Sequence, residues 1–599
     1  MALTEFDLLK SVSVPNVGPI NTCGLTVVTG PNSCGKTQFL TDIRETCHGA
    51  ARELVVCPSV ELEKPADFEG FVELLVKHGA ITQTINEKGV EIFEQASPSM
   101  GDKNSGWQLG KDQFKYAYTL LTKKHSRNTK TFYEPLGRTL VTALFLRRRL
   151  ITTDTVDSFD YEMAQPQNEL QALYLNEDAQ VALTQELGRT FNRAVWLDGS
   201  RGGKLCLRVS DDSHMPPADE RLQPEKMKQY RTIDSEGDGL KSYTAICLSL
   251  LLGQRPICLI DEPEMCLHPP QAYSLGRFIG KHGTSVEHST FVATHSSHIL
   301  RGIIEETEKL QVLRLSKNAG RFAGDLIPYE ALRECVERPS TKAETILDGI
   351  FSEAVCIVES EGDRSVYEAA TESLGGSLQH DVHFVSVGGI GGFASTIQLY
   401  QKLKIPTVVI SDLDLISKSE NLKKVLLALA PQKAVDEIIE SAEEVVVQVR
   451  TRGPELSPEE LLATFERLSK HPMDWNVGDN EKLRKELIST GKKLADLSRL
   501  KHGGRNNYEE NIALLTSLDA LLAACRRHGL FLVPVGELEH WCSELMRDGP
   551  SRTRKSEWAN EAAIRIRANP EGAVDVCSFM RAVTQCQRDQ ANRYAGYQT

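Results

Sequence analysis

An eight-residue segment near the start of the chain has the residue types and spacing of a phosphate-binding loop. The β-rich run 25–29 (LTVVT) leads into GPNSCGKT at residues 30–37, and a helix-like stretch follows. Glycines in such a loop let backbone N–H groups turn toward a phosphate, and the helix N-terminus adds the positive end of its dipole. The pattern therefore predicts a nucleotide site formed by Asn32, Gly35, Lys36 and Thr37.

Two later strands are expected to complete this site. Lys36 would meet the β- and γ-phosphates and Thr37 would ligate Mg²⁺. The run 256–264 (PICLIDEPE) is a buried strand ending in Asp261, which can hold Mg²⁺ through water, and Glu262, which can polarise an attacking water. Another strand ends at His295, 34 residues after Asp261, where it can contact a γ-phosphate. The alternative is a chance glycine turn, an ordinary buried strand and a structural histidine.

Acidic residues also follow two apolar strands in the C-terminal half. Glu359 comes after the run 355–358, and the run 406–410 is followed by Ser411, Asp412, Leu413 and Asp414. In a parallel sheet the carboxyl ends of these strands lie along one edge. Glu359, Asp412 and Asp414 would then form an all-oxygen site suited to Mg²⁺ or Mn²⁺. A lone D-x-D is more often a solvated turn, but its order after Glu359 favours the metal site.

The elements that must position these residues form two alternating strand–helix regions, so the predicted fold class is α/β. Residues 1–345 are expected to form an ATPase-like domain with a helical insertion at about 60–195. Residues 350–599 are expected to form a Rossmann-like domain with a helical insertion at about 417–525. We expect the first insertion to carry assembly contacts.

Composition excludes several classes of protein. The chain has 599 residues, of which 40% are hydrophobic and 25% charged, as is typical of globular proteins. No apolar window is long enough for a membrane span and no secretory signal is recognisable, which predicts a cytoplasmic protein without membrane contact. No C-x-x-C pair occurs, so zinc ribbons are excluded.

The net charge of −13 does not favour nucleic-acid binding, so DNA would have to be bound through local basic clusters or bridging metal ions. Such clusters exist, for example Arg147–Arg149 and the segment 552–567. Each is more typical of a solvated helix face. The cluster 552–567 differs because it adjoins the predicted metal site.

The N-terminal motifs resemble those of ATP-binding-cassette ATPases of the SMC-like type. That family has a serine–glycine signature about 20 residues before its second acidic motif. Here DSEGDG at 234–239 takes that place and departs from the usual LSGGQ wording, with Ser235 and Gly237 as the matching residues. The resemblance implies that ATP is bound between two subunits, and therefore at least a dimer.

The C-terminal motifs resemble a TOPRIM domain, and the E-x-E-x-D spacing from Glu359 to Asp363 resembles the OLD-family nucleases, which join an ATPase to TOPRIM. The resemblance implies Asp363 and Glu539 as further metal ligands, with Glu537 as the neighbouring alternative, and Lys555 beside the scissile phosphate. Two metal ions about 4 Å apart would then activate water and stabilise the leaving oxygen.

Together these patterns predict an ATP-binding, divalent-metal-dependent DNA endonuclease, similar to the antiphage nucleases of the Gabija kind. The expected cofactors are ATP and Mg²⁺ or Mn²⁺. The expected partners are DNA, further copies of the chain and, as a further candidate, a second defence-system protein. One alternative is a non-nucleolytic ATP-gated DNA clamp or repair protein with a degenerate TOPRIM domain. A topoisomerase or primase is less favoured, because no zinc module is present and no tyrosine is marked out as a nucleophile.

Overall fold

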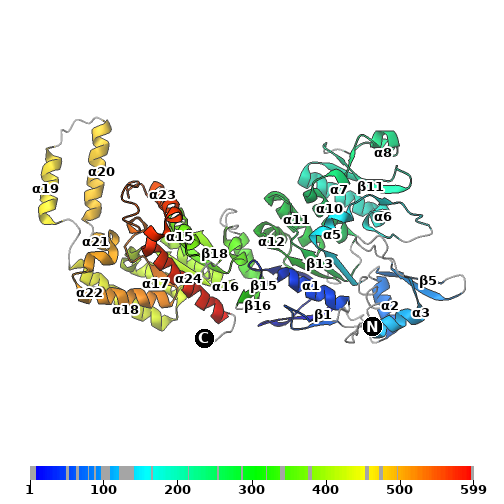
Figure 1. Ribbon diagram of the computed structural model, residues 1–599, viewed down its shortest axis with the longest axis horizontal. Coiled ribbons are helices and arrows are strands. Elements are labelled where there is room, and N and C mark those ends of the chain that lie inside the picture. The colour runs from blue at the N-terminus through cyan, green and yellow to red at the C-terminus, as the bar shows by residue number, and fades with distance from the viewer. Residues whose placement is uncertain are drawn as a thin grey trace. The chain divides into compact units, whose positions relative to one another are not determined.

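The computed structural model divides into two compact units, residues 1–351 and 352–599 (Figure 1). The residues that it describes are 9–48, 53–62, 67–77, 80–85, 89–95, 108–120, 140–162, 166–212, 215–252, 255–284, 288–318, 320–337, 345–375, 381–451, 457–470, 477–494 and 497–594.

A six-stranded sheet forms the centre of the first unit. In spatial order its strands are β16 (Arg321–Ile327), β15 (Leu310–Asn318), β3 (Gly24–Thr29), β14 (Ser289–Ala293), β13 (Ile257–Asp261) and β8 (Val141–Leu144). All pairs are parallel except β15 with β16. Every residue of β3 and β14 is buried, as expected for parallel strands that are covered on both faces.

Three helices follow the strands whose ends carry the predicted site: α1 (Lys36–Cys47), α11 (Pro269–His282) and α12 (Ser297–Glu306). α11 begins with a capping box at His268 followed by proline, and Ser296 caps α12. α11 and α12 pack so closely that a Cβ on Gly276 would lie 2.3 Å from the Ile299 carbonyl oxygen. This contact therefore requires glycine at position 276.

Smaller elements surround this sheet. One antiparallel sheet contains β1 (Leu9–Val14), β2 (Gly18–Ile20) and β4 (Val60–Leu62), and a second contains β5 (Ile81–Ile85), β6 (Glu91–Gln95) and β7 (Gln108–Gly110). A third contains β9 (Val156–Asp157), β10 (Ala194–Asp198), β11 (Lys204–Ser210) and β12 (Arg231–Thr232). The remaining helices are α2 (Phe68–Lys77), α3 (Lys111–Leu120), α5 (Leu146–Thr152), α6 (Glu169–Tyr174), α7 (Glu177–Phe191), α8 (Ala218–Arg221), α9 (Pro224–Met227), α10 (Asp238–Leu251) and α13 (Tyr329–Val336).

The segment 60–195 therefore contains strands as well as the helices that its sequence led us to expect. The phrase KYAYTLLTKK (115–124) lies in α3 as far as Leu120, as expected, and its last four residues fall outside the described part of the chain. TALFLRRRL is divided between β8 and α5. β8 is a strand because it pairs in parallel with β13 at the edge of the central sheet. This long-range pairing overrides the local helical preference.

A buried carboxyl group in α6 gives a prediction about stability. Burial raises the pKa of Glu169 from 4.5 to about 7, although Arg255 and Arg148 act in the opposite direction. An acid with a raised pKa in the folded state stabilises the fold below its ordinary pKa and loses this contribution as the pH rises toward 7. We expect Glu169→Gln to raise the melting temperature relative to the parent at pH 8 and to change it less at pH 4.5. Thermal melts across this range measure the difference, and a difference independent of pH would contradict it.

The second unit is built on a four-stranded parallel sheet. In spatial order its strands are β18 (Val382–Ser386), β17 (Ala354–Val358), β19 (Thr407–Ser411) and β20 (Leu530–Leu532). The helices α15 (Glu361–Glu372), α16 (Phe393–Lys402), α23 (Lys555–Ala568) and α24 (Val574–Tyr594) accompany it. Its core contains Tyr367, Phe531, Trp541, Trp558 and Phe579.

The segment 417–525 supplies helices to this unit between β19 and β20. They are α17 (Ser419–Leu429), α18 (Gln432–Arg450), α19 (Pro458–Ser469), α20 (Val477–Lys493), α21 (Ser498–Lys501) and α22 (Ile512–Arg527). α18 and α22 pack against each other. Among the described residues, no helix combines the length and the apolar character needed to cross a bilayer.

Candidate functional site

The predicted phosphate loop connects β3 to α1. Its lysine is folded back onto the loop: Lys36 Nζ donates hydrogen bonds to the carbonyl oxygens of Gly30 (2.8 Å) and Pro31 (2.9 Å). Gly30 and Gly35 both have positive φ angles, and a Cβ on Gly30 would lie 2.1 Å from the Leu315 carbonyl oxygen. Asn32 is exposed on the loop. The loop thus needs glycine at position 30 to lie against β15 and at position 35 to lie against Phe322 and Val56.

The loop lies beside the predicted acidic pair because β14 alone separates β3 from β13 in the sheet. Thr37 Oγ1 donates a 3.0 Å hydrogen bond to Asp261 Oδ1. Burial, with a contribution from Glu262, raises the pKa of Asp261 to about 6, although the Thr37 hydrogen bond opposes the shift. A carboxylate that is costly to ionise is stabilised by a bound cation, so this pair has the chemistry of a Mg²⁺ site.

His295 follows β14 on the same edge and is tied to the acidic loop through Glu264. His295 Nδ1 lies 3.0 Å from Glu264 Oε1 and 3.7 Å from Glu262 Oε1. Glu264 also accepts hydrogen bonds from the His295 N–H and the Thr294 hydroxyl, both 2.9 Å long. Sequence reasoning missed Glu264, whose place three residues after Asp261 was the available signal.

Sequence reasoning also missed Arg149, which it placed in a solvated basic cluster. Arg149 is fully buried on α5. Its guanidinium donates to the carbonyl oxygens of Leu144 (2.9 Å), Asp261 and Glu262 (3.0 Å), and to Ser242 Oγ of α10 (2.9 Å). One side chain therefore joins β8, the acidic loop and α10. Glu262 depends on this support because it has the unfavourable φ of 46°.

We expect Arg149→Leu to destabilise the first unit by about 3 kcal/mol, because it leaves several buried hydrogen-bonding groups without a donor. Arg149→Lys should lie between this variant and the parent, since an ammonium lacks the planar set of five donors. Thermal melts measure the effect, with the exposed Arg147→Lys as the control. Equal melting temperatures for Arg149→Leu and Arg147→Lys would contradict the assigned role.

The predicted signature residues lie at the start of α10. Gly237 caps this helix, and Ser235 Oγ donates to the Thr232 carbonyl oxygen within its own turn (2.8 Å). A Cβ on Gly239 would lie 2.4 Å from the Cys266 carbonyl oxygen, so the helix start packs closely on the loop after the acidic pair. Ser235 itself is exposed, which leaves its role in nucleotide binding a prediction.

In the second unit, Glu359 directly follows β17 and Asp412 directly follows β19, and these parallel strands are neighbours. The pKa of Asp412 is raised to about 8. Burial is the largest cause, and repulsion from Asp363, Asp414 and Glu359 adds to it. Burial and the charges of Asp363 and Asp414 likewise raise the pKa of Glu359. The structure therefore brings four predicted residues into one electrostatic cluster.

Asp363 also has a structural task. Its Oδ2 accepts hydrogen bonds from the Ser360 N–H (2.9 Å) and Oγ (2.8 Å), and the Ser360 hydroxyl accepts from the Asp363 N–H. This reciprocal pair is the capping box of α15. Burial raises the pKa of Asp363. The spacing from Glu359 to Asp363 thus has a helix-capping explanation beside the predicted role in metal binding.

Glu537, Glu539 and Lys555 form a third part of the same edge. The two glutamates follow β20, the neighbour of β19, and Lys555 is the first residue of α23. Lys555 Nζ lies 3.1 Å from Glu537 Oε2 and 3.1 Å from Glu539 Oε1. Burial disfavours the ammonium, but the two carboxylates outweigh burial and raise the pKa of Lys555. Lys555 therefore contacts both Glu537 and Glu539, the two candidates for the metal-binding acid that follows β20.

The donor set of this edge fits a divalent cation in its chemistry. Its carboxylates are partly buried and repel one another, which is the arrangement that a divalent ion relieves. Among the described residues, however, no three acidic, histidine or cysteine side chains already stand as a group that could hold an ion.

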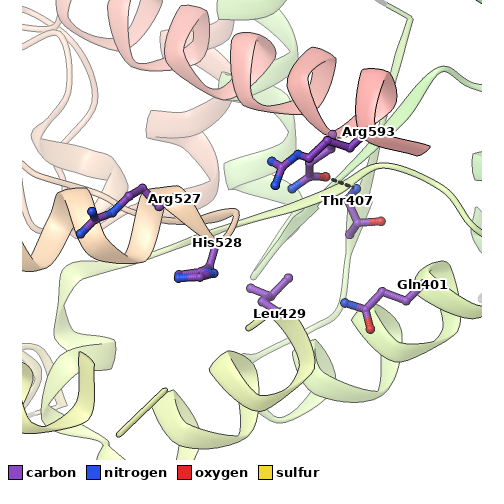
Figure 2. A pocket seen from close by; sticks show the side chains of 7 residues that line it. Gln401, Thr407, Leu429, Arg527, His528 and Arg593 are labelled. Carbon is purple, nitrogen blue, oxygen red and sulfur yellow. Dashed lines mark hydrogen bonds between the residues drawn. The ribbon is translucent and has the colours of Figure 1, made fainter. Parts of the chain in front are cut away.

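A cavity of about 340 Å³ lies at the opposite edge of this sheet, where β19 and β20 begin (Figure 2). Gln590 Oε1 accepts a 2.8 Å hydrogen bond from the Thr407 N–H there. The labelled Arg527 and Arg593 come from the last turns of α22 and α24. Basic side chains at helix C-terminal ends are stabilised by the helix dipole, which gives them a structural explanation.

Two family models match this chain, one mainly in each of its two compact units. Residues 350–414 match the family model described as "Overcoming lysogenization defect protein-like, TOPRIM domain". Residues 110–301 match the model described as "AAA domain, putative AbiEii toxin, Type IV TA system". No curated protein matches the chain.

The solved structures similar to the chain include heads of SMC proteins. The SmcHead bound to the C-winged helix domain of ScpA is 11% identical, covering 54% of this chain and 99% of its own, with a TM-score of 0.29. The SMC head domain from Thermotoga maritima is 12% identical, covering 53% and 97%, with a TM-score of 0.27.

Fold and sequence together define a mixed α/β protein in which an ATPase domain is followed by a TOPRIM domain with a parallel sheet, which confirms the predicted fold class. The chain carries an OLD-like TOPRIM domain and an AAA-type ATPase domain, the pairing of an ATPase–TOPRIM OLD fusion, as the sequence motifs predicted. Its domains are those of an ATP-dependent, nuclease-type protein.

Proposed function

We propose that the protein is a divalent-metal-dependent DNA endonuclease, which nicks DNA or cuts both strands, and that its ATPase domain regulates the cutting. The observation that carries this proposal is the acidic edge of the second unit, where Asp412 lies among three further carboxylates. A bound divalent ion supplies an activated water and charge stabilisation at the leaving oxygen.

The remaining roles belong to side chains of the chain itself. Glu359, Asp363, Asp412, Asp414 and Glu539 would hold Mg²⁺ or Mn²⁺, with Glu537 as the alternative to Glu539. Lys555, already fixed between two glutamates, would meet charge that develops on the scissile phosphate. This is phosphodiester hydrolysis without a covalent enzyme intermediate.

The first unit would bind ATP and hydrolyse it. Asn32, Gly35, Lys36 and Thr37 would hold the phosphates, Asp261 the Mg²⁺ ion, and Ser235 with Gly237 the ATP of a partner subunit. Glu262 would polarise the attacking water, and His295, held by Glu264, would contact the γ-phosphate.

Incubation with supercoiled plasmid tests the proposal, using Mg²⁺ or Mn²⁺ with and without ATP. Nicked or linear product that disappears with a chelator is the expected result. Unchanged plasmid would overturn the nuclease and favour the ATP-gated clamp, and relaxed closed circles would indicate a topoisomerase.

ATP bound between two subunits requires at least a dimer, so we expect a dimer or larger assembly. Light scattering at micromolar concentration, with and without ATP, measures the molar mass. A strict monomer under both conditions would contradict the prediction.

We propose that the assembly acts in the cytoplasm as part of antiphage defence. A second defence-system protein would then be a candidate partner.

A further inference from the structure

Two lysines that lie outside the predicted site contact its acidic cluster. Lys418 Nζ lies 3.1 Å from Asp414 Oδ2, and Lys501 Nζ lies 3.5 Å from the same oxygen. The two lysine side chains are 41% and 40% exposed, whereas that of Asp414 is 16% exposed. Both lysine side chains are therefore partly open to solvent, from which a ligand can approach, while the Asp414 side chain is less exposed.

The position of Lys501 is set by close backbone packing. Gly536, in the turn after β20, has φ +100°, and a Cβ there would lie 2.2 Å from the Lys501 carbonyl oxygen. The carbonyl oxygen of Gly536 also accepts a 2.9 Å hydrogen bond from the Leu413 N–H, beside Asp412 and Asp414. One glycine turn thus holds the acidic loop and the end of α21 together.

A second contact of the same kind fixes this segment. A Cβ on Gly504 would lie 2.2 Å from the Pro534 carbonyl oxygen, which also accepts a 2.8 Å hydrogen bond from the Arg505 N–H. Arg505 in turn forms a two-pronged ion pair with Asp519 of α22, at 2.8 and 2.9 Å. Lys501 is therefore brought to the acidic edge by the helical segment 417–525.

The charges at this edge indicate what the two lysines do. Lys418 and Lys501 both contact the same carboxylate oxygen of Asp414. Their positive charges also favour the ionised form of Glu359, although burial and neighbouring carboxylates raise the pKa of Glu359 overall. A divalent ion held by Asp414 would repel both ammonium groups at short range. Each lysine would then need another anion, and the anion that enters with DNA is a backbone phosphate, which lysine binds as a point charge.

We propose that Lys418 and Lys501 position the DNA backbone at the cleavage site. They bind Asp414 in the metal-free protein, and they bind a phosphate of the DNA strand when Asp414 takes up a divalent ion. This inference rests on the proposed nuclease function and adds to it two phosphate-binding residues, one of which comes from the helical segment.

If the lysines exchange Asp414 for a DNA phosphate, their removal should affect DNA binding and metal binding in opposite directions. Lys418→Gln and Lys501→Gln should each weaken binding of a fluorescent DNA duplex in Ca²⁺ by about 3- to 10-fold. The slope of log K against log salt should fall by about one for each lysine. Binding of Mn²⁺ alone, followed by its EPR signal, should be unchanged or tighter because a competing cation is gone. The exposed Lys424→Gln on α17 is the charge-matched control.

The outcomes separate this inference from the proposed function. DNA affinity and salt slope equal to those of Lys424→Gln would overturn the inference. Loss of both DNA and Mn²⁺ binding with a lower melting temperature would also overturn it, since it would show a structural role. A parent protein that neither binds nor nicks DNA would instead refute the proposed nuclease.

Discussion

Asp412→Asn should reduce plasmid nicking by at least about 100-fold, in Mg²⁺ and in Mn²⁺, because the amide removes a charged metal ligand from the centre of the acidic cluster. The same change should leave the melting temperature unchanged or higher. Asp412 is partly buried, and this burial together with the neighbouring carboxylates raises its pKa to about 8, so its ionised form destabilises the fold. Loss of activity without loss of stability distinguishes a ligand from a structural residue.

Glu359→Gln should behave in the same way, and Glu420→Gln, an exposed carboxylate on α17, is the matched control. Glu539→Gln should weaken cutting less completely, since Glu537 remains beside it as an alternative ligand. Lys555→Gln should weaken cutting because it removes the positive charge that would meet the scissile phosphate. ATP hydrolysis should persist in all these variants. Undiminished nicking by both Asp412→Asn and Glu359→Gln, in preparations free of contaminating nuclease, would refute the metal site.

Lys36→Ala should weaken ATP binding by at least about 10-fold and reduce hydrolysis by about 100-fold, because it removes the charge that meets the β- and γ-phosphates. Glu262→Gln should separate the two effects. It keeps the loop and Asp261 intact, so ATP should bind within about two-fold of the parent while hydrolysis falls by about 100-fold. Equilibrium binding of a fluorescent ATP analogue and phosphate release measure the two quantities.

Lys10→Ala, an exposed lysine on β1, is the control for the loss of charge. Lys36 also holds the carbonyl groups of Gly30 and Pro31, so its removal can disturb the loop itself. Glu262→Gln does not carry this ambiguity. Parent-like hydrolysis by both Lys36→Ala and Glu262→Gln would show that the nucleotide site lies elsewhere.

The sequence was most informative where a short pattern determines both an element and its end. The strand before Gly30 and the strand before Asp261 could be recognised locally, and parallel pairing then brings their ends to one edge. The hydrogen bond between Thr37 and Asp261 is the consequence. The same reasoning brought Glu359 and Asp412 together in the second sheet. The roles of these residues remain predictions until they are tested.

The residues that sequence reasoning missed act across long separations in the chain. Arg149 contacts the carbonyl group of Glu262, 113 positions later, and Lys501 contacts Asp414, 87 positions earlier. Neither arginine nor lysine in a charged helix differs locally from a solvated neighbour. The strand β8 was missed for a similar reason, because its partner β13 lies far along the chain. Spacing alone cannot predict such contacts.

The two acidic edges lie in different compact units, which has a genetic consequence. A chain with Lys36→Ala keeps its cleavage residues, and a chain with Asp412→Asn keeps its nucleotide loop. If copies assemble as proposed, co-expression of these two defective alleles should restore part of the activity through mixed assemblies. Either allele expressed in excess over the parent should be dominant-negative, because each inactive chain would be incorporated beside an active one.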